Sequence, residues 1–162
     1  MNRTPLAVLL DTNILLLWLV GNTDAGLLLT FKRVQSFEER DIVLLERLLR
    51  PFQRMVTTPH ILTEVSNFVD QSPIYRRARL VEALREFIED HVEIYEAASV
   101  LSNRSEFNSL GLSDTALASL SSDAVVITTD FHLSERIASQ GGQTINFSRA
   151  RSSYLVPPNR LS

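Results

Sequence analysis

The sequence predicts an α/β fold in which helices cover both faces of a central, mainly parallel sheet, a three-layer α/β/α sandwich. Two runs of residues, 6–10 and 124–129, have the near-continuous hydrophobicity of strands that are buried on both faces. Segments with helical periodicity separate these runs from shorter candidate strands. Because strands that alternate with helices favour parallel pairing, we expect one sheet covered on both sides.

The first half of the chain begins with a strand and then becomes largely helical. The expected elements, in order, are a strand over 6–10, a helix over 13–20 that breaks at 21–24, an unassigned segment over 26–34, a helix over 36–50, a strand over 55–57 and a helix that starts after Thr58. Ser36 and Glu39 have the spacing of a capping box. Thr58 is a favourable N-cap, and Pro59 suits the first helical position because its missing N–H has no partner there.

The second half repeats the alternation of helix and strand. Its expected elements are a helix over 74–90, a strand over 92–95, a helical turn over 97–103, a helix over 115–121, a strand over 124–129, a helix over 133–139 and a strand over 144–147. Gly141 and Gly142 are expected to end the penultimate element. We therefore predict one domain over 1–148, with 149–162 as a loosely ordered C-terminal tail.

Composition limits the classes of function. The 162 residues are enough for one compact core, and 44% hydrophobic with 22% charged residues is ordinary for a folded domain. The absence of cysteine excludes disulfides, cysteine zinc sites and thiol catalysis. A formal charge of −3 argues against a broad basic surface for nucleic acid, so phosphate binding is expected to be local.

The first apolar stretch does not have the pattern of a targeting or membrane segment. Asp11 and Asn13 interrupt it, and no small-residue cleavage pattern follows. The stretch is also too short and too polar to span a bilayer. We expect a cytoplasmic protein with no membrane partner.

Four acidic residues occur at positions that an α/β fold brings together. Asp11 and Asp130 each follow an apolar run and so leave the carboxyl end of an expected parallel strand, where ligands bind in open α/β sheets. Asp114 opens a helical stretch, and Glu64 lies about a turn and a half inside the helix that Pro59 begins. This spacing predicts a shared acidic site.

Each acid also has a purely structural interpretation. Asp11 and Asp130 are suitable N-caps for the helices that follow them, and Asp114 suits the first turn of a helix behind Ser113. Glu64 is harder to explain in this way, because it lies at the margin of an apolar helical stripe. A carboxylate there is partly desolvated, which costs free energy unless a cation or hydrogen-bond donors compensate.

The settings of the four acids together resemble the PIN domain, a small α/β nuclease fold of toxin–antitoxin ribonucleases and RNA-processing nucleases. The matching segments, in the order of the family, are Val8-Leu9-Leu10-Asp11-Thr12-Asn13, Pro59-His60-Ile61-Leu62-Thr63-Glu64-Val65, Gly111-Leu112-Ser113-Asp114-Thr115-Ala116 and Ile127-Thr128-Thr129-Asp130. They span most of the chain. The connection over 21–37 looks longer than in the compact toxins of the family, and the tail after Phe147 has no matching motif.

The resemblance implies a ribonuclease that depends on Mg²⁺ or Mn²⁺. By analogy Asp11, Glu64, Asp114 and Asp130 would hold the metal, and oxygen-only ligands suit these hard cations. The ion would activate water for attack on an RNA phosphodiester. Neighbouring donors expected to orient the carboxylates are Thr12, Asn13, Ser113 and Thr129. The family also implies a homodimer and, for a toxin, an antitoxin partner.

The densest basic cluster is a candidate for RNA contact. Arg76, Arg77 and Arg79 lie together on the helix expected over 74–90, and arginine suits forked contacts with phosphate. The alternative is a solvated helix face, because the same helix carries several acidic residues.

Two other functions remain open. A phosphatase of the haloacid-dehalogenase type also begins with a strand that ends in aspartate, but it needs a second acid where Asn13 stands, and the chain has a single lysine, Lys32. A non-catalytic PIN-like scaffold is the other alternative, with Leu15, Trp18 and Leu19 as a candidate partner surface. All four acids are present, which favours the enzyme.

Overall fold

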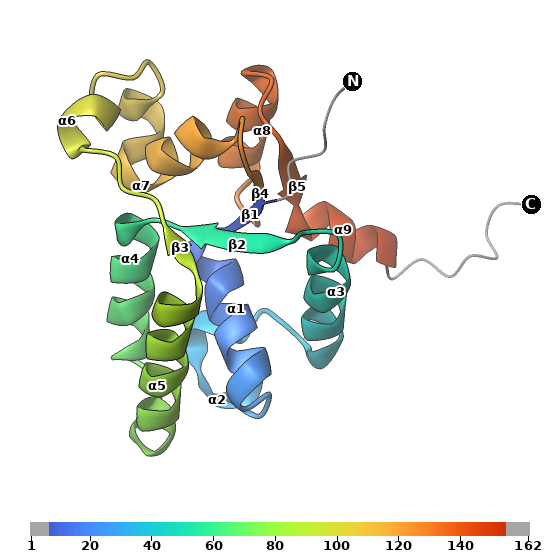
Figure 1. The fold of residues 1–162 in the computed structure, drawn as a ribbon. Helices are drawn as coiled ribbons and strands as arrows, with labels where there is room; N and C mark the ends of the chain where they lie inside the picture. The colour runs from blue at the N-terminus through green and yellow to red at the C-terminus, as the bar shows by residue number, and fades with distance from the viewer. Residues whose placement is uncertain (1–6, 155–162) are drawn as a thin grey trace, which may run out of the picture.

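A computed structural model describes residues 7–154, and its centre is a five-stranded parallel sheet in the order β3-β2-β1-β4-β5. The strands are β1 (Ala7–Leu10), β2 (Arg54–Thr57), β3 (Val92–Glu93), β4 (Val125–Thr128) and β5 (Thr144–Asn146). Helices cover both faces of this sheet (Figure 1). The predicted fold class, a three-layer α/β/α sandwich, is therefore confirmed.

The described helices divide between the two faces. They are α1 (Thr12–Thr23), α2 (Leu27–Thr30), the 3-10 turn η1 (Lys32–Val34), α3 (Glu39–Leu49), α4 (Pro59–Val69), α5 (Ile74–Asp90), α6 (Ala98–Leu101), α7 (Phe107–Leu120), α8 (Phe131–Ser139) and α9 (Phe147–Tyr154). Figure 1 shows α1 to α5 on one face and α6 to α8 on the other.

The order of the strands reverses direction in the middle of the sheet. From β1 the chain moves outward through β2 to β3, and it then returns to the other side of β1 to form β4 and β5. Val8, Leu9 and Leu10 of β1 are in register with Val125, Val126 and Ile127 of β4. The gap between the carboxyl ends of β1 and β4 is thus the topological switch point, where α/β sheets of this kind bind ligands.

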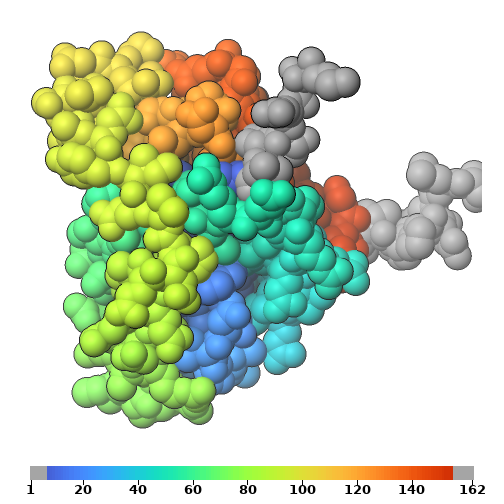
Figure 2. Space-filling view, in the orientation of Figure 1, coloured from blue at the N-terminus to red at the C-terminus, as the bar shows by residue number. Residues whose placement is uncertain are grey.

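Helix α1 forms the centre of the core on its side of the sheet. Its leucines and isoleucine are almost fully buried, as expected for a helix that is apolar on most of its circumference. The space-filling view shows α3 and α5 covering most of α1, with only a strip left at the surface (Figure 2). The residue after β1, Asp11, is therefore attached to one of the most buried helices of the protein.

Helix α1 does not break where expected. It starts at Thr12 and continues through Gly21 to Thr23. Gly21 has a packing role, because a Cβ there would lie 2.7 Å from the Ile42 side chain of α3. Asn22 and Thr23 donate to the carbonyls of Trp18 and Leu19 at 2.7 and 2.6 Å, so the polar side chains of the last turn have partners within the helix.

The capping box predicted for α3 is wrong by two residues. The helix begins at Glu39, with Glu38 as N-cap, and the Asp41 carboxylate accepts a hydrogen bond of 2.8 Å from the Glu38 N–H. Ser36 lies outside the helix, and its carbonyl accepts a hydrogen bond from Arg151 at 3.0 Å. The same spacing of cap and acid occurs at two positions along the chain, and the structure uses the one whose acid, Asp41, is buried.

The C-terminal region is more ordered than expected up to Tyr154. We predicted a loose tail from Arg149, whereas the structure has α9 there. Arg151 pairs with the buried Asp41 at 2.8 Å, and the Phe147 ring packs edge-on against Phe37. The remainder of the predicted tail, 155–162, and the first residue of the predicted first strand, Leu6, lie outside the described residues.

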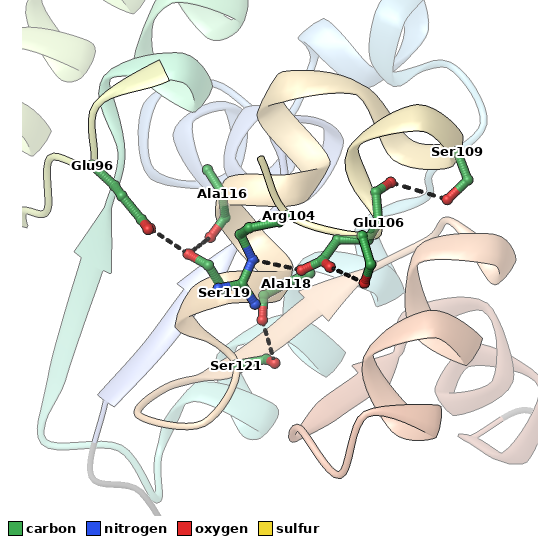
Figure 3. A network of polar contacts seen from close by, with 9 residues as sticks. Glu96, Arg104, Glu106, Ser109, Ala116, Ala118, Ser119 and Ser121 are labelled. Atoms are coloured by element: carbon green, nitrogen blue, oxygen red, sulfur yellow. Dashed lines mark hydrogen bonds and ion pairs between the residues drawn. The ribbon is translucent and has the colours of Figure 1, made fainter. Parts of the chain in front are cut away.

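A polar network fixes the segment that leads into α7. Buried Glu106 accepts from Arg104 at 2.6 Å and from Ser105 at 3.1 Å, and Ser119 donates to Glu96 at 2.7 Å (Figure 3). Helix α7 starts at Phe107, earlier than the predicted start at Thr115, because the chain kinks rather than ends at Gly111. Within residues 7–154 no helix is both long and apolar enough to cross a membrane.

Candidate active site

Asp11 and Asp130 lie beside each other at the switch point of the sheet. Asp11 directly follows β1, and Asp130 is two residues beyond the end of β4. The pairing of these strands continues past β1, since the Asp11 N–H donates to the Ile127 carbonyl at 3.0 Å. Both aspartates thus lie at the carboxyl edge of the sheet, on adjacent strands.

A threonine hydroxyl at the end of β4 links the two aspartates. Thr128 Oγ1 donates to Asp11 Oδ2 at 2.6 Å and accepts from the Asp130 N–H at 3.0 Å. The other oxygen of Asp11 accepts from the Thr12 N–H at 2.7 Å. Thr128 is fully buried, so this hydroxyl fixes one carboxylate and the backbone of the other in a dry environment.

Glu64 reaches the same edge from α4 and is held between two other hydroxyls. Thr12 Oγ1 donates to Glu64 Oε2 at 2.6 Å, and Ser113 Oγ donates to Glu64 Oε1 at 2.5 Å. The two donors come from α1 and α7, which are far apart in sequence. Both Glu64 oxygens therefore have fixed positions, and Glu64 connects the edge of the sheet to α7.

Asp114 is brought to the site by a kink that requires glycine. Gly111 has φ 76° and ψ −177°, a backbone conformation that side chains with a Cβ rarely adopt. The kink divides α7 into two parts, and Ser113 and Asp114 begin the second part. The glycine of the Gly111-Leu112-Ser113-Asp114 motif thus sets the position of both residues.

The ionisation of the acids shows that they lie within electrostatic reach of one another. Burial, and then the charges of Asp11, Asp130 and Glu64, raise the pKa of Asp114 to about 7. The pKa of Asp11 is also raised, first by burial and then by Glu64 and Asp130, although its hydrogen bonds from Thr128 and Thr12 oppose the shift. The charges of Glu64 and Asp130 therefore act on both Asp11 and Asp114.

The carboxylates do not point at one common position. Within residues 7–154, no three acidic or histidine side chains converge as a set of metal ligands. The hydrogen bonds account for this, because Asp11 and Glu64 turn their oxygens toward hydroxyl and N–H donors. The donor set nevertheless fits a hard cation, since its ligand atoms are oxygens and a cation would relieve the mutual repulsion.

The structural roles expected for two of the acids are also present. Asp130 is the N-cap of α8, with Oδ1 accepting from the Leu133 N–H at 3.0 Å. Asp11 caps α1 through the Thr12 N–H. Each of these carboxylates keeps a second oxygen beyond the capping bond, and for Asp11 this oxygen receives the Thr128 hydroxyl. Capping and membership of the acidic group are therefore compatible.

The predicted donors divide into those that contact the acids and those that do not. Thr12 and Ser113 donate to Glu64, as described above. Asn13 is exposed on α1, and among the described residues neither Asn13 nor Thr129 has a side-chain hydrogen bond to the acids. Sequence reasoning missed Thr128. The register of the strands was the available signal. Thr128 lies beside Asp11 on the adjacent strand and can reach its carboxylate, whereas Thr129, the next residue along the chain, is less well placed to do so.

The arginines predicted to contact RNA have partners within the protein. Arg76 pairs with Asp24, Arg77 donates to the Ser72 carbonyl at 2.9 Å, and Arg79 donates to the Thr23 carbonyl at 3.2 Å. The contacts of Arg76 and Arg79 fasten the start of α5 to the end of α1, and that of Arg77 fastens it to the turn after α4. Figure 1 shows this end of α5 at the side of the molecule away from the sheet.

Two cavities adjoin the acidic edge. One, of about 470 Å³, is lined by Asn13, Phe31, Lys32, Arg33 and Gln71. The other, of about 530 Å³, is lined by residues that follow β4 and β5, including Thr129, Phe131 and Arg149. Phe131 directly follows Asp130, and 54% of its surface is exposed. Each cavity thus has a lining residue within two positions of one of the aspartates.

Comparison with known proteins adds no family assignment. A scan against protein-family models, a search of curated proteins and a search of solved structures each found no match to this chain.

Proposed function

We propose that the protein is a metal-dependent ribonuclease of the PIN type. The observation that carries this proposal is the gathering of Asp11, Glu64, Asp114 and Asp130 at the switch point of a parallel sheet, where burial and the neighbouring acids raise the pKa of Asp11 and of Asp114. A group of acids that raises the pKa of one member to about 7 is destabilising for the protein alone. Such strained groups are typical of functional sites.

The same four carboxylates would hold the cation. Oxygen ligands of this kind favour Mg²⁺ or Mn²⁺, which keep several waters in their coordination shell. When bound, the ion would supply a water of lowered pKa and positive charge next to the phosphate. This local charge would offset the net negative charge of the chain, which otherwise repels RNA.

The remaining residues would position the carboxylates and the substrate. Thr12, Ser113 and Thr128 fix carboxylate oxygens through hydroxyl bonds, and such supporting donors commonly change metal affinity or activity by about 10-fold to 100-fold. Phe131 offers an exposed ring beside Asp130, on which an unpaired base would stack. These features favour a single-stranded substrate.

Cleavage of a labelled single-stranded RNA with Mn²⁺ tests the proposal. We compare the wild type with Asp130→Asn and with the control Asp123→Asn, an exposed aspartate in the turn before β4. Asp130→Asn should lower the single-turnover rate by about 100-fold, from the loss of a charged group at the metal. Asp123→Asn should cleave like the wild type.

Equal activity in all three proteins would show that the cleavage comes from another site or a contaminant, and it would contradict the proposal. Asparagine keeps the N-cap of α8, so a melt of Asp130→Asn should remain close to that of the wild type. A large loss of stability in this variant would assign a structural role to Asp130 instead.

A further inference from the structure

The cavity beside Asn13 is built from the segment between α1 and α3. Lys32 and Arg33 of η1 form one wall, and Asn13 of α1 and Gln71, just after α4, form the others. Phe31 and Val34 of this segment are buried, and they hold η1 against α1. The exposed cationic side chains of η1 therefore extend from a fixed backbone.

Arg33 is held in one orientation by two contacts. Its guanidinium carbon lies 4.0 Å from the centre of the Phe68 ring, and its Nε and Nη2 both donate to Gln71 Oε1 at 3.3 Å. An arginine stacked on a ring loses less side-chain entropy when it binds a ligand, because its plane is already set. Its remaining N–H donors are free of partners among residues 7–154.

Lys32 is the single lysine of the chain and supplies a second positive charge to the same cavity. It is exposed, and within the described part of the chain it forms no ion pair. The Asn13 and Gln71 amides and the Phe31 ring complete the lining, which contains no carboxylate. This combination is suited to a phosphate oxygen rather than to a cation or an apolar group.

The position of the cavity relates it to the acids. Asn13 is two residues beyond Asp11, and Phe68 lies one helical turn beyond Glu64 on α4. The cavity is therefore connected to the carboxylates through two helices. Asn13, which lines it, is on α1 close to Asp11, and Phe68, on which Arg33 stacks, is on α4 close to Glu64.

We propose that Lys32 and Arg33 bind a backbone phosphate of single-stranded RNA adjacent to the bond that is cut. This inference rests on the proposed nuclease function and names the residues that hold its substrate. It also gives a role to the connection over 21–37, which is longer than the family pattern suggests. The arginines at the start of α5 pair with a carboxylate or with backbone carbonyls, whereas Lys32 and Arg33 line a cavity and have no carboxylate partner among residues 7–154.

Binding of a labelled single-stranded RNA, measured by fluorescence anisotropy over a series of salt concentrations, tests the proposal. EDTA is present so that no strand is cut. Lys32→Gln and Arg33→Gln should each weaken binding and lower the slope of log K against log salt by roughly 0.7, the value for one lost phosphate contact on a single strand. Arg85→Gln, which removes an exposed charge from α5, should change neither quantity.

Two further arms make the outcome decisive. Arg33→Lys keeps the charge, so it should keep most of the wild-type slope even if the stacking on Phe68 is lost. DNA of the same sequence should show the same loss in the Gln variants, because a phosphate contact does not read the sugar. A loss confined to RNA would place a ribose hydroxyl in the cavity and overturn the phosphate assignment.

The failure of this inference and that of the nuclease proposal have different signatures. Wild-type cleavage of RNA with unchanged salt slopes in both Gln variants would overturn the cavity assignment and leave the nuclease standing. RNA binding that depends on Lys32 and Arg33, without cleavage by the wild type, would support the phosphate site and overturn the nuclease. Absence of RNA binding by the wild type in EDTA would overturn the phosphate site, and only absence of cleavage with Mn²⁺ in addition would overturn both.

Discussion

Replacement of Asp114 by asparagine should change how the stability of the protein depends on pH. In the folded protein burial, followed by the charges of Asp11, Asp130 and Glu64, raises the pKa of Asp114 to about 7, against 3.8 for an ordinary aspartate. Between these values the folded state holds a proton that the unfolded chain has lost. The free energy of unfolding must therefore fall as the pH rises from about 4 to about 7.

The size of this effect follows from the two pKa values. A difference of about 3 in pKa corresponds to about 4 kcal/mol above neutral pH, as an upper limit. Asp114 is partly exposed, so solvent screening reduces this, and we expect about 2 kcal/mol. Asparagine has nearly the same shape and does not ionise. The variant should melt about 4–8 °C above the wild type near pH 8 and within a degree or two of it near pH 4.

Circular dichroism melts of both proteins from about pH 4 to about pH 9, first with EDTA, measure this difference. The variant should retain a weaker slope from Asp11, whose pKa is also raised by burial. Addition of Mn²⁺ near neutral pH should raise the wild-type melting temperature more than that of the variant, because the cation binds the ionised group. A wild-type stability that is flat over this range, or a variant that is less stable near pH 8, would refute the raised pKa of Asp114 and the effect of the neighbouring acids on it.

Three further predictions concern the supports of the site. Thr128→Val should keep the fold but slow RNA cleavage by about 10-fold to 100-fold in a single-turnover assay, because Asp11 loses its 2.6 Å hydroxyl bond; an unaltered rate would exclude the support role. Gly111→Ala should lower the free energy of unfolding by about 1–3 kcal/mol in urea titrations, since φ is 76° with no atom near the added Cβ; a neutral effect would mean that the kink relaxes. Although burial opposes it, hydrogen bonds from Arg104 and Ser105 lower the pKa of Glu106. Glu106→Gln should therefore lower the free energy of unfolding by about 2 kcal/mol near neutral pH, and this loss should shrink as acid protonates the wild-type carboxyl. A loss that persists in acid would contradict this.

The strands and the positions of the acids were predictable because both follow from local pattern. The apolar runs of β1 and β4 end at the aspartates, and parallel pairing then places those ends at one edge. The Thr58 cap and the Pro59 start of α4 were likewise readable, since their chemistry involves only adjacent residues. These features needed no knowledge of distant contacts.

The features that the sequence did not reveal depend on tertiary contacts. Gly21 resembles a helix stop until the Ile42 side chain of α3 is seen to need its space. The cap of α3 shifted to Glu38 because Asp41 is buried beneath Arg151, more than a hundred residues away. Helix α9 is held by the same ion pair. Because the helix itself has few apolar residues, its sequence alone did not indicate that it packs on the domain.

Hydrogen bonds from hydroxyl groups explain how the protein can keep four neighbouring carboxylates at the edge of its core. Thr12, Ser113 and Thr128 each donate to Asp11 or Glu64, and hydrogen bonds to the charged form offset part of the cost of burial. Asp114 receives no such bond from the described residues, and it is the acid whose pKa rises to about 7. On the proposed function this asymmetry has a use. The supported carboxylates keep fixed oxygens, whereas the unsupported Asp114 has the most to gain from a cation, so metal binding should be strongest above the pKa of Asp114 and weaken as the pH falls through it.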